Sequence, residues 1–249
     1  MDRALAIEFS ADMAFFRRGY TTTSTLSYTI PPKTVIAGLI AGMAGKRYNS
    51  YSEILESSRV AVVLLNRPRR LMVRQNLLFT TDSNYNNSEK RTRVIFQYLR
   101  FPKYRVYFYT PNDFYGELKE LLEKGESIYT PYLGTANCIA SVKYLGEVAV
   151  HETEINRSIV SVSSIIPLNS AEPNPIDLKE IKGGFRIMKE RIPASMDADR
   201  IVRRFVDVLF LEPAPETRDI SYPYCFGVSS GKYWEVEGAS GLRENVIFF

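Results

Sequence analysis

The stretch that decides the fold lies between residues 67 and 102 and reads RPRRLMVRQNLLFTTDSNYNNSEKRTRVIFQYLRFP. Both of its ends alternate polar and apolar residues, and residues 82–88 between them are polar residues that favour turns. This pattern predicts a β-hairpin whose strands, of about 16 residues each, would reach roughly 50 Å if fully extended. A hairpin this long and this basic is poorly suited to a core, so we expect it to project from the body of the protein.

The sequence on both sides of the hairpin alternates between strand and helix patterns. Apolar patterning predicts strands at residues 3–9, 60–65, 104–109 and 139–145. One helix is predicted to start at Pro31 and Pro32, since proline is tolerated in a first helical turn, and a second to run from Asn112 to Glu123. The order strand, helix, strand, strand, helix, strand is that of a ferredoxin-like domain, whose sheet is a common platform for RNA.

The first of these helices is rich in glycine, with Gly38, Gly42 and Gly45 recurring along it. Glycine in a helix interior costs about 1 kcal/mol relative to alanine. Three of them therefore indicate a reason in packing or in binding. We expect them to let the helix pack closely against the sheet.

Beyond residue 151 the pattern changes to short strands separated by prolines. Strands are predicted at residues 159–166, 184–188, 206–211, 233–236 and 246–249. The sequence thus predicts an α+β protein with two parts. Residues 1–150 form a ferredoxin-like RNA-binding domain that carries the hairpin at about 67–102, and residues 151–249 form a smaller, mostly β lobe.

Composition excludes several classes of protein. The chain has 249 residues, of which 45% are apolar and 24% charged, as in an ordinary globular protein. Its longest apolar run, residues 35–44, is too short to span a membrane, and the N-terminus does not resemble a signal peptide. We therefore expect a cytoplasmic protein with no membrane partner. Cys138 and Cys225 are far apart and lack a CxxC spacing, which argues against a disulfide framework and a structural zinc site.

The charges are distributed unevenly. Residues 1–105 contain 17 Lys and Arg against 7 Asp and Glu, whereas residues 106–249 contain 15 against 21. A basic half joined to an acidic half suggests a polyanion on one face and another kind of partner elsewhere. A chance imbalance of solvated surface charge is the alternative.

Signals for catalysis are weak. The single histidine, His151, is followed by Glu152, and no HExxH, GxSxG, GxGxxG or GKS/T motif is present. His, Cys and acidic residues do not show metal-ligand spacing, so we expect no metal and no cofactor. RNA cleavage by tyrosine and lysine side chains stays open, because the chain has 16 tyrosines.

Signals for binding nucleic acid are stronger. Arg17, Arg18 and Tyr20 precede a hydroxyl-rich segment, a combination suited to phosphates and bases. The hairpin adds the cations Arg67, Arg69, Arg70, Arg74, Lys90, Arg91 and Arg93, interleaved with Phe79, Tyr85, Phe96 and Tyr98. Cations with aromatic rings between them are typical of proteins that bind single strands. The alternatives are a solvated basic hairpin and, for Tyr28, Phe96 and Tyr98, hydrophobic packing.

At these residues the chain resembles Cas family five of the CRISPR-associated proteins, in the form found in type I-B and I-A interference complexes. The most specific match is residues 14–45, which read AFFRRGYTTTSTLSYTIPPKTVIAGLIAGMAG. A second is residues 130–148, which read TPYLGTANCIASVKYLGEV. Residues 100–109 (RFPKYRVYFY) and 190–200 (ERIPASMDADR) resemble a strand and a C-terminal motif of the same family.

The resemblance implies an RRM-like domain with a protruding thumb, which corresponds here to the hairpin at about residues 67–102. It also implies a non-catalytic subunit of a type I complex (Cascade) that binds the 5′ handle of CRISPR RNA and caps the backbone filament, in defence against viruses and plasmids. The implied partners are the backbone subunit of Cas family seven and the large subunit of Cas family eight. Relatives in type I-C systems instead cleave precursor RNA without a metal.

On this reading, the handle phosphates and bases would be held by residues from the loop after the first strand, the start of the first helix, the hairpin and the Tyr-Leu-Gly loop. The expected RNA-binding residues are Arg17, Arg18, Tyr20, Lys33, Thr34, Arg69, Arg70, Arg74, Lys90, Arg91, Arg93, Tyr132 and Gly134. The acidic C-terminal half would face protein subunits. A metal-independent endoribonuclease and a general RNA chaperone are the alternatives.

Overall fold

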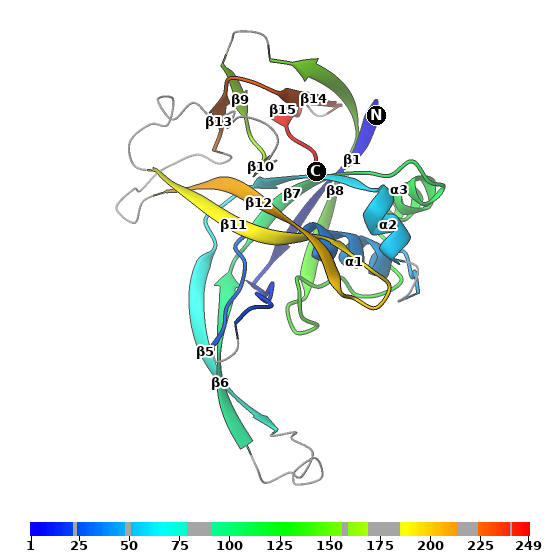
Figure 1. Cartoon of the computed structure of the whole chain (residues 1–249). Coiled ribbons are helices and arrows are strands. Elements are labelled where there is room, and N and C mark those ends of the chain that lie inside the picture. The colour runs from blue at the N-terminus through cyan, green and yellow to red at the C-terminus, as the bar shows by residue number, and fades with distance from the viewer. Residues whose placement is uncertain are drawn as a thin grey trace.

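A six-stranded antiparallel sheet with the order β15-β14-β8-β1-β7-β4 forms the centre of the protein (Figure 1). The computed structural model describes residues 1–21, 24–47, 51–78, 91–155, 159–168, 185–213, 224–239 and 241–249. The strands of the central sheet are β1 (Arg3–Ala11), β4 (Arg59–Leu64), β7 (Lys103–Tyr109), β8 (Ala140–Glu154), β14 (Lys232–Gly238) and β15 (Arg243–Val246). Together with helices α1 (Lys33–Met43), α2 (Tyr51–Ser57) and α3 (Phe114–Lys124), they confirm the predicted α+β class.

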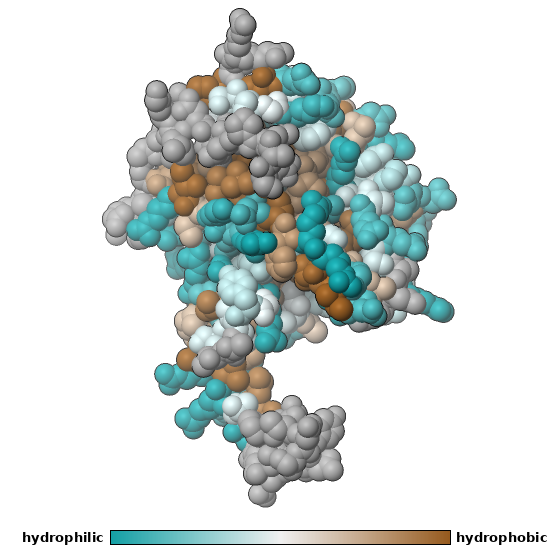
Figure 2. Space-filling model, in the orientation of Figure 1, coloured by the Kyte–Doolittle hydropathy of each residue, from teal (hydrophilic) through white to brown (hydrophobic). Residues whose placement is uncertain are grey.

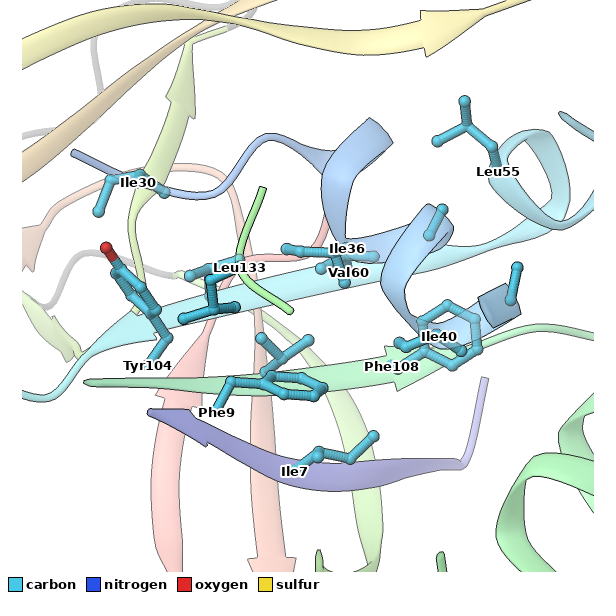
Figure 3. Close-up of a cluster of buried hydrophobic side chains, with 14 of the residues drawn as sticks. Ile7, Phe9, Ile30, Ile36, Ile40, Leu55, Val60, Tyr104, Phe108 and Leu133 are labelled. Atoms are coloured by element: carbon cyan, nitrogen blue, oxygen red, sulfur yellow. The ribbon is translucent and has the colours of Figure 1, made fainter. Parts of the chain in front are cut away.

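The sheet is buried on both faces, because its central strands are apolar on both faces. Leu5, Ile7 and Phe9 of β1 belong to the large core on the side of the helices, whereas Ala4 and Ala6 belong to a second cluster on the opposite side. Figure 3 shows how the first core is filled. Tight packing of this kind fixes the helices on the sheet and so positions the loops that leave it.

Helix α1 lies on the core side of the sheet. Ile40 lies beside Phe108 of β7, and Ile36 lies close to Val60 of β4 (Figure 3). The helix begins directly after Pro32, as the sequence predicts. Helix α2, between α1 and β4, was not predicted, because its seven residues are too short to show a helical period.

A hairpin lies at the predicted place and projects from the body of the protein, with 10 described residues in each strand where about 16 were expected (Figure 1). Strand β5 (Arg69–Leu78) pairs with β6 (Arg91–Arg100) in one continuous antiparallel register, from Arg69 opposite Arg100 to Leu78 opposite Arg91. We call β5 and β6 the thumb. At its base, β6 also pairs with the short strands β2 (Met13–Ala14) and β3 (Ser24–Thr25). Residues 79–90, which include Lys90 and the predicted turn, lie outside the described residues.

The C-terminal segment forms longer strands than the sequence predicts. Strands β11 (Phe185–Met196) and β12 (Val202–Pro213) make a long hairpin, where only residues 184–188 and 206–211 were expected. The prediction stopped short because charged residues interrupt the apolar pattern on both strands. The remaining strands are β9 (Val160–Val162), β10 (Ile166–Leu168) and β13 (Phe226–Val228), and β14 extends the central sheet by pairing with β8.

Two buried carboxylates on the β11–β12 hairpin hold the N-terminal segment. Glu190, whose side chain is 4% exposed, accepts hydrogen bonds from Arg18 at 2.6 Å and from the backbone N–H of Thr29 at 2.9 Å. Glu212 accepts one from Arg70 at 3.0 Å, and Arg70 also donates to the hydroxyl of Thr29. We call Glu190 and Glu212 the carboxylate clasp. It fastens the C-terminal hairpin to residues 18–30 and to the base of the thumb.

Burial raises the pKa of Glu190 above its ordinary value, although Arg18 and the Thr29 N–H oppose this by favouring the charged form. A carboxylate so deeply buried is stable only while its hydrogen-bond donors stay in place. Removing one partner of a buried ion pair leaves the other groups unsatisfied. The clasp is therefore a point at which a single substitution weakens the whole fold.

We predict that Glu190→Ala lowers the free energy of unfolding by about 3 kcal/mol, because it leaves Arg18 and the donors of Thr29 unpaired. Urea denaturation measures this loss. Glu190→Gln keeps a hydrogen-bond acceptor and should therefore lower the free energy of unfolding by less. The matched control is Glu237→Ala, which breaks an exposed pair with Arg243 and should change stability little. Equal effects of Glu190→Ala and Glu237→Ala would contradict the role of the clasp.

Candidate nucleic-acid interface

Four of the six arginines of the thumb lie on the face opposite its packed aromatic residues. Alternation along paired strands places Arg70, Arg74, Arg91 and Arg93 on one face of the hairpin. Apart from Arg70, which lies at the base and pairs with Glu212, these arginines are exposed and make no ion pair among the described residues. Figure 2 shows hydrophilic side chains along the thumb with hydrophobic ones between them. The result is an exposed row of Arg74, Arg91 and Arg93.

The other face of the thumb packs against the body. Tyr98 and Phe96 of β6 lie on this face with their ring centroids 5.4 Å from that of Phe15, and Tyr98 is buried. Tyr28 is also buried, under the guanidinium of Arg18. For Tyr28, Phe96 and Tyr98 the structure therefore supports hydrophobic packing instead of base stacking. Arg69 is exposed on this face, opposite Arg100.

The three residues predicted in the loop after β1 have different environments. Arg17 is exposed. Arg18 is partly buried, where it pairs with Glu190 and donates to the carbonyl of Ser27 and the hydroxyl of Tyr20. Tyr20 is 66% exposed, so its ring is accessible. Arg17 and Tyr20 are thus available to a ligand, whereas Arg18 already serves the clasp.

Lys33 is not placed as predicted. Its ammonium is buried and donates a hydrogen bond of 2.7 Å to the carbonyl of Ser58, so it does not face solvent at the start of α1. The sequence analysis expected Lys33 to hold handle phosphates at the start of the first helix. Burial, assisted by the nearby charges of Arg204 and Arg59, lowers the pKa of Lys33 to about 8. Thr34 is buried as well, but it lines the cleft described below.

The Tyr132–Gly134 loop joins the thumb to a cleft. Tyr132 is 45% exposed. Gly134 has φ +93°, and a Cβ atom at this position would overlap the carbonyl oxygen of Phe15, so only glycine fits. The backbone N–H of Phe15 donates to the carbonyl of Leu133 at 3.0 Å. Gly134 therefore fixes the loop against the segment that supports the thumb.

A cleft of about 590 Å³ lies between α1, the loop before β8 and the tip of the β11–β12 hairpin. Of the predicted residues, it brings together Thr34, Tyr132 and Gly134. The sequence analysis missed its other polar and aromatic residues, which are Lys46, Arg47, Tyr51, Tyr129, Thr130 and Arg200. Tyr129 could have been found from its closeness to Tyr132 in the sequence. Arg200 comes from a distant hairpin and gave no such signal.

The glycines of α1 do not pack against the sheet, which corrects that expectation. A Cβ atom at Gly38 or Gly42 would meet no atom within 4 Å, and both residues line the cleft. Gly45, which has φ +67° and lies beyond the end of α1, is the one of the three that is confined, and its neighbour is Ile128. The sequence indicated either packing or binding as the reason for these glycines. At Gly38 and Gly42 the structure excludes packing against the sheet.

In the part of the chain that the structure describes, no metal-binding cluster is found. No cluster of three or more His, Cys, Asp or Glu side chains could hold a metal there. His151 is exposed on β8, where its backbone pairs with that of Glu235. In the same described residues, no helix is long and apolar enough to cross a membrane.

We predict that Lys33→Met raises the free energy of unfolding at pH 7, because it removes the cost of burying an ammonium. The folded-state pKa of about 8 lies below the unfolded value near 10.5. Between these values only the unfolded wild type keeps the proton, so wild-type stability gains on the variant as pH rises. Urea denaturation at pH 7 and pH 9.5 should show a smaller difference at the higher pH. A difference independent of pH, as expected for the exposed control Lys124→Met, would contradict this.

Comparisons with known proteins found a matching family model and solved structures of similar fold. Residues 4–200 match the model of a family described as CRISPR-associated protein (Cas_Cas5). The fold is similar to a chain of a CRISPR RNA-guided surveillance complex, with a TM-score of 0.52 and 12% identity over 85% of this chain and 90% of that chain. It is also similar to a CRISPR protein from Archaeoglobus fulgidus, with a TM-score of 0.53 and 16% identity over 98% of each chain. No curated protein sequence matches.

Identities this low show a shared fold alone, whereas the family model covers most of the chain. It includes the residue 14–45 and residue 130–148 segments on which the resemblance was based. The protein therefore belongs to the Cas5 family of CRISPR-associated proteins.

Proposed function

We propose that this protein is a non-catalytic subunit of a type I CRISPR interference complex (Cascade), in which it binds the 5′ handle of CRISPR RNA and caps the backbone filament. Membership of the Cas5 family supports a role in CRISPR defence against viruses and plasmids. One solved structure with a similar fold belongs to a CRISPR RNA-guided surveillance complex. Binding of the handle and the absence of catalysis go beyond these comparisons and are our proposals.

The observation that carries the proposal is the row of Arg74, Arg91 and Arg93 on one face of the thumb. Cations at alternate positions of paired strands form a continuous stripe, which suits the evenly spaced phosphates of a single strand. In a hairpin that is only solvated, nothing would require these three arginines to share a face. Arg17 and the ring of Tyr20 extend the accessible groups at the base of the thumb.

The architecture of the body supports an RNA platform. The strands and helices β1, α1, β4, β7, α3 and β8 follow the ferredoxin-like chain order, and the sheet order β8-β1-β7-β4 agrees with that arrangement. Side chains of α1, α2 and α3 all belong to the core on one side of the sheet. We propose a ferredoxin-like, RRM-like domain that holds RNA by its loops and thumb, since both sheet faces are buried.

The partner subunits are proposed from the acidic surface. Exposed carboxylates occur on α3, β8 and β14, namely Glu117, Glu120, Glu123, Glu152, Glu154, Glu235 and Glu237. Five of these carboxylates pair with lysine or arginine, whereas Glu120 and Glu235 make no ion pair among the described residues. Carboxylates without an ion pair disfavour RNA, because both are negatively charged. We propose that the backbone subunit of Cas family seven contacts the thumb and that the large subunit of Cas family eight contacts the body.

We predict that replacing Arg74, Arg91 and Arg93 together by alanine weakens binding of a handle-bearing RNA and lowers the slope of log K against log salt by roughly 2, since each lost phosphate contact contributes about 0.7. Fluorescence anisotropy over a salt series measures both quantities. The control removes three cations elsewhere, in Lys124→Ala, Lys232→Ala and Arg243→Ala. If both triple variants lose the same affinity, net charge explains the binding and the thumb does not.

The absence of catalysis is tested by incubating the purified protein with CRISPR repeat RNA in EDTA. We predict that the RNA stays intact, since the single histidine lies exposed on β8. Gel analysis of end-labelled RNA is the measurement, and His151→Ala is the matched variant. Cleavage at one position on the 5′ side of the handle would replace the proposal by the endoribonuclease alternative.

A further inference from the structure

Four large apolar side chains are exposed in the segment that leads into β8. Ile128, Tyr129, Tyr132 and Ile139 have exposed fractions of 62%, 61%, 45% and 63%. We call these four residues the apolar patch. Single exposed apolar residues are ordinary on a protein surface, whereas a group of them marks a site of interaction.

The side chains of the apolar patch are neighbours, and the segment that carries them is fastened to the body. Tyr132 and Ile139 are opposite each other in an isolated β-bridge, and Tyr129 and Tyr132 line the same cleft. At the other end, the N–H of Ile128 donates to the carbonyl of Met43 at 2.7 Å. A surface that is fixed in advance loses little conformational entropy when a partner binds.

The composition of the apolar patch favours a protein partner over a nucleic acid. Ile128 and Ile139 are the two most exposed of the four, and they offer neither a charge for a phosphate nor a ring for a base. The cores of protein–protein interfaces are rich in aromatic side chains and poor in charges. Two tyrosines between two isoleucines match that composition.

The apolar patch has an acidic border. Residues 113–126, which include α3, contain five Asp and Glu against two Lys. Near the end of α3, Glu120, Lys124 and Glu126 are exposed and make no ion pair among the described residues, which leaves a net negative charge. Such a border attracts a basic partner, and it repels both RNA and a second copy of the same surface.

The cations of the neighbouring cleft do not offset this border. Lys46 forms an ion pair with Glu117, and its ammonium lies 5.4 Å from the ring centroid of Phe114. Arg47 and Arg200 also make interactions within the chain. The border therefore keeps its negative sign beside the cleft.

We propose that the apolar patch docks a partner protein whose contacting surface is apolar and bordered by lysine or arginine. Tyr129 and Tyr132 are the anchors, because a tyrosine combines a large apolar ring with a hydroxyl group. This inference rests on the proposed function, since it takes the partner to be another protein subunit of the complex. It assigns one surface of the body to that contact and gives the chemistry of the surface opposite.

The test truncates the apolar patch and leaves the core intact. Tyr129→Ser with Ile139→Ser changes two side chains that are more than half exposed, so the double variant should fold as stably as the wild type. Each chain is co-expressed with the proposed backbone and large subunits and with CRISPR RNA. We expect native mass spectrometry to show one subunit missing from the complex of the variant. Titration of that subunit should give an affinity roughly tenfold or more below that of the wild type.

The matched control truncates apolar side chains outside the apolar patch. Ile159→Ser with Ile187→Ser changes two residues that are 46% and 41% exposed. This double variant should retain every subunit that the wild type retains. If both double variants lose the same subunit, any loss of exposed apolar surface weakens the complex, and the assignment to the apolar patch is overturned.

A charge reversal tests the acidic border. Glu120→Lys with Glu126→Lys should slow association with the same subunit and make the association rate less dependent on salt. Stopped-flow fluorescence measures this rate. Glu235→Lys with Glu237→Lys reverses the same number of exposed charges on β14 and should leave the rate unchanged. Equal effects of the two reversals would overturn the assignment of a basic partner to this border.

The outcomes for the apolar patch and for the proposed function are distinguishable. If the variant with a truncated patch retains every subunit, the patch is not a docking site and the proposed function stands. If the wild type joins no protein subunit, both fail. If the wild type alone is a dimer and the variant a monomer, the occupant is a second copy and the basic partner is excluded. If the variant loses a subunit while the wild type does not bind the handle, the docking site stands and the proposed handle binding fails.

Discussion

The buried carboxylate of Glu190 is the constraint on which the arrangement of the two halves of the chain depends. It accepts hydrogen bonds from Arg18, from the hydroxyl and N–H of Thr29 and from the N–H of Ile30. Glu190 lies on a hairpin about 160 residues later in the sequence than Thr29. Because so many donors converge on one group, the segment that leads from the thumb base to α1 has a single position. The start of α1, the cleft beside it and the base of the thumb follow from that position.

The carboxylate clasp also neutralises two of the cations that the sequence offered as RNA-binding residues. Arg18 and Arg70 belong to the basic half of the chain, yet the acidic half neutralises them within the fold. The charge imbalance read from the sequence is therefore partly an internal complementarity. Among the described residues, the exposed arginines without an ion pair include Arg17 and the outer row of the thumb. The molecule thus keeps a rigid, internally paired base and an exposed basic surface at its periphery.

The thumb and the cleft are chemically different surfaces. A row of arginines on a projecting hairpin contacts phosphates and has little means to distinguish bases. The cleft instead exposes helix backbone at Gly38 and Gly42 and has tyrosine rings in its lining. Gly134, which no other residue could replace against Phe15, keeps the two surfaces at a fixed separation.

The sequence alone determined the features that local pattern encodes. Alternation around a polar turn gave the thumb, and apolar periodicity gave β1, α1, β4, β7, α3 and the first part of β8, because these patterns fix backbone hydrogen bonding and the buried face within a few residues. Only the tertiary structure showed which groups each charged side chain contacts. It buried Lys33 against Ser58, joined Arg18 to Glu190, extended β11 and β12 through charged residues, and left Gly38 and Gly42 facing a cleft. Each of these depends on groups far away along the chain, and a local pattern holds no information about which distant group will lie opposite.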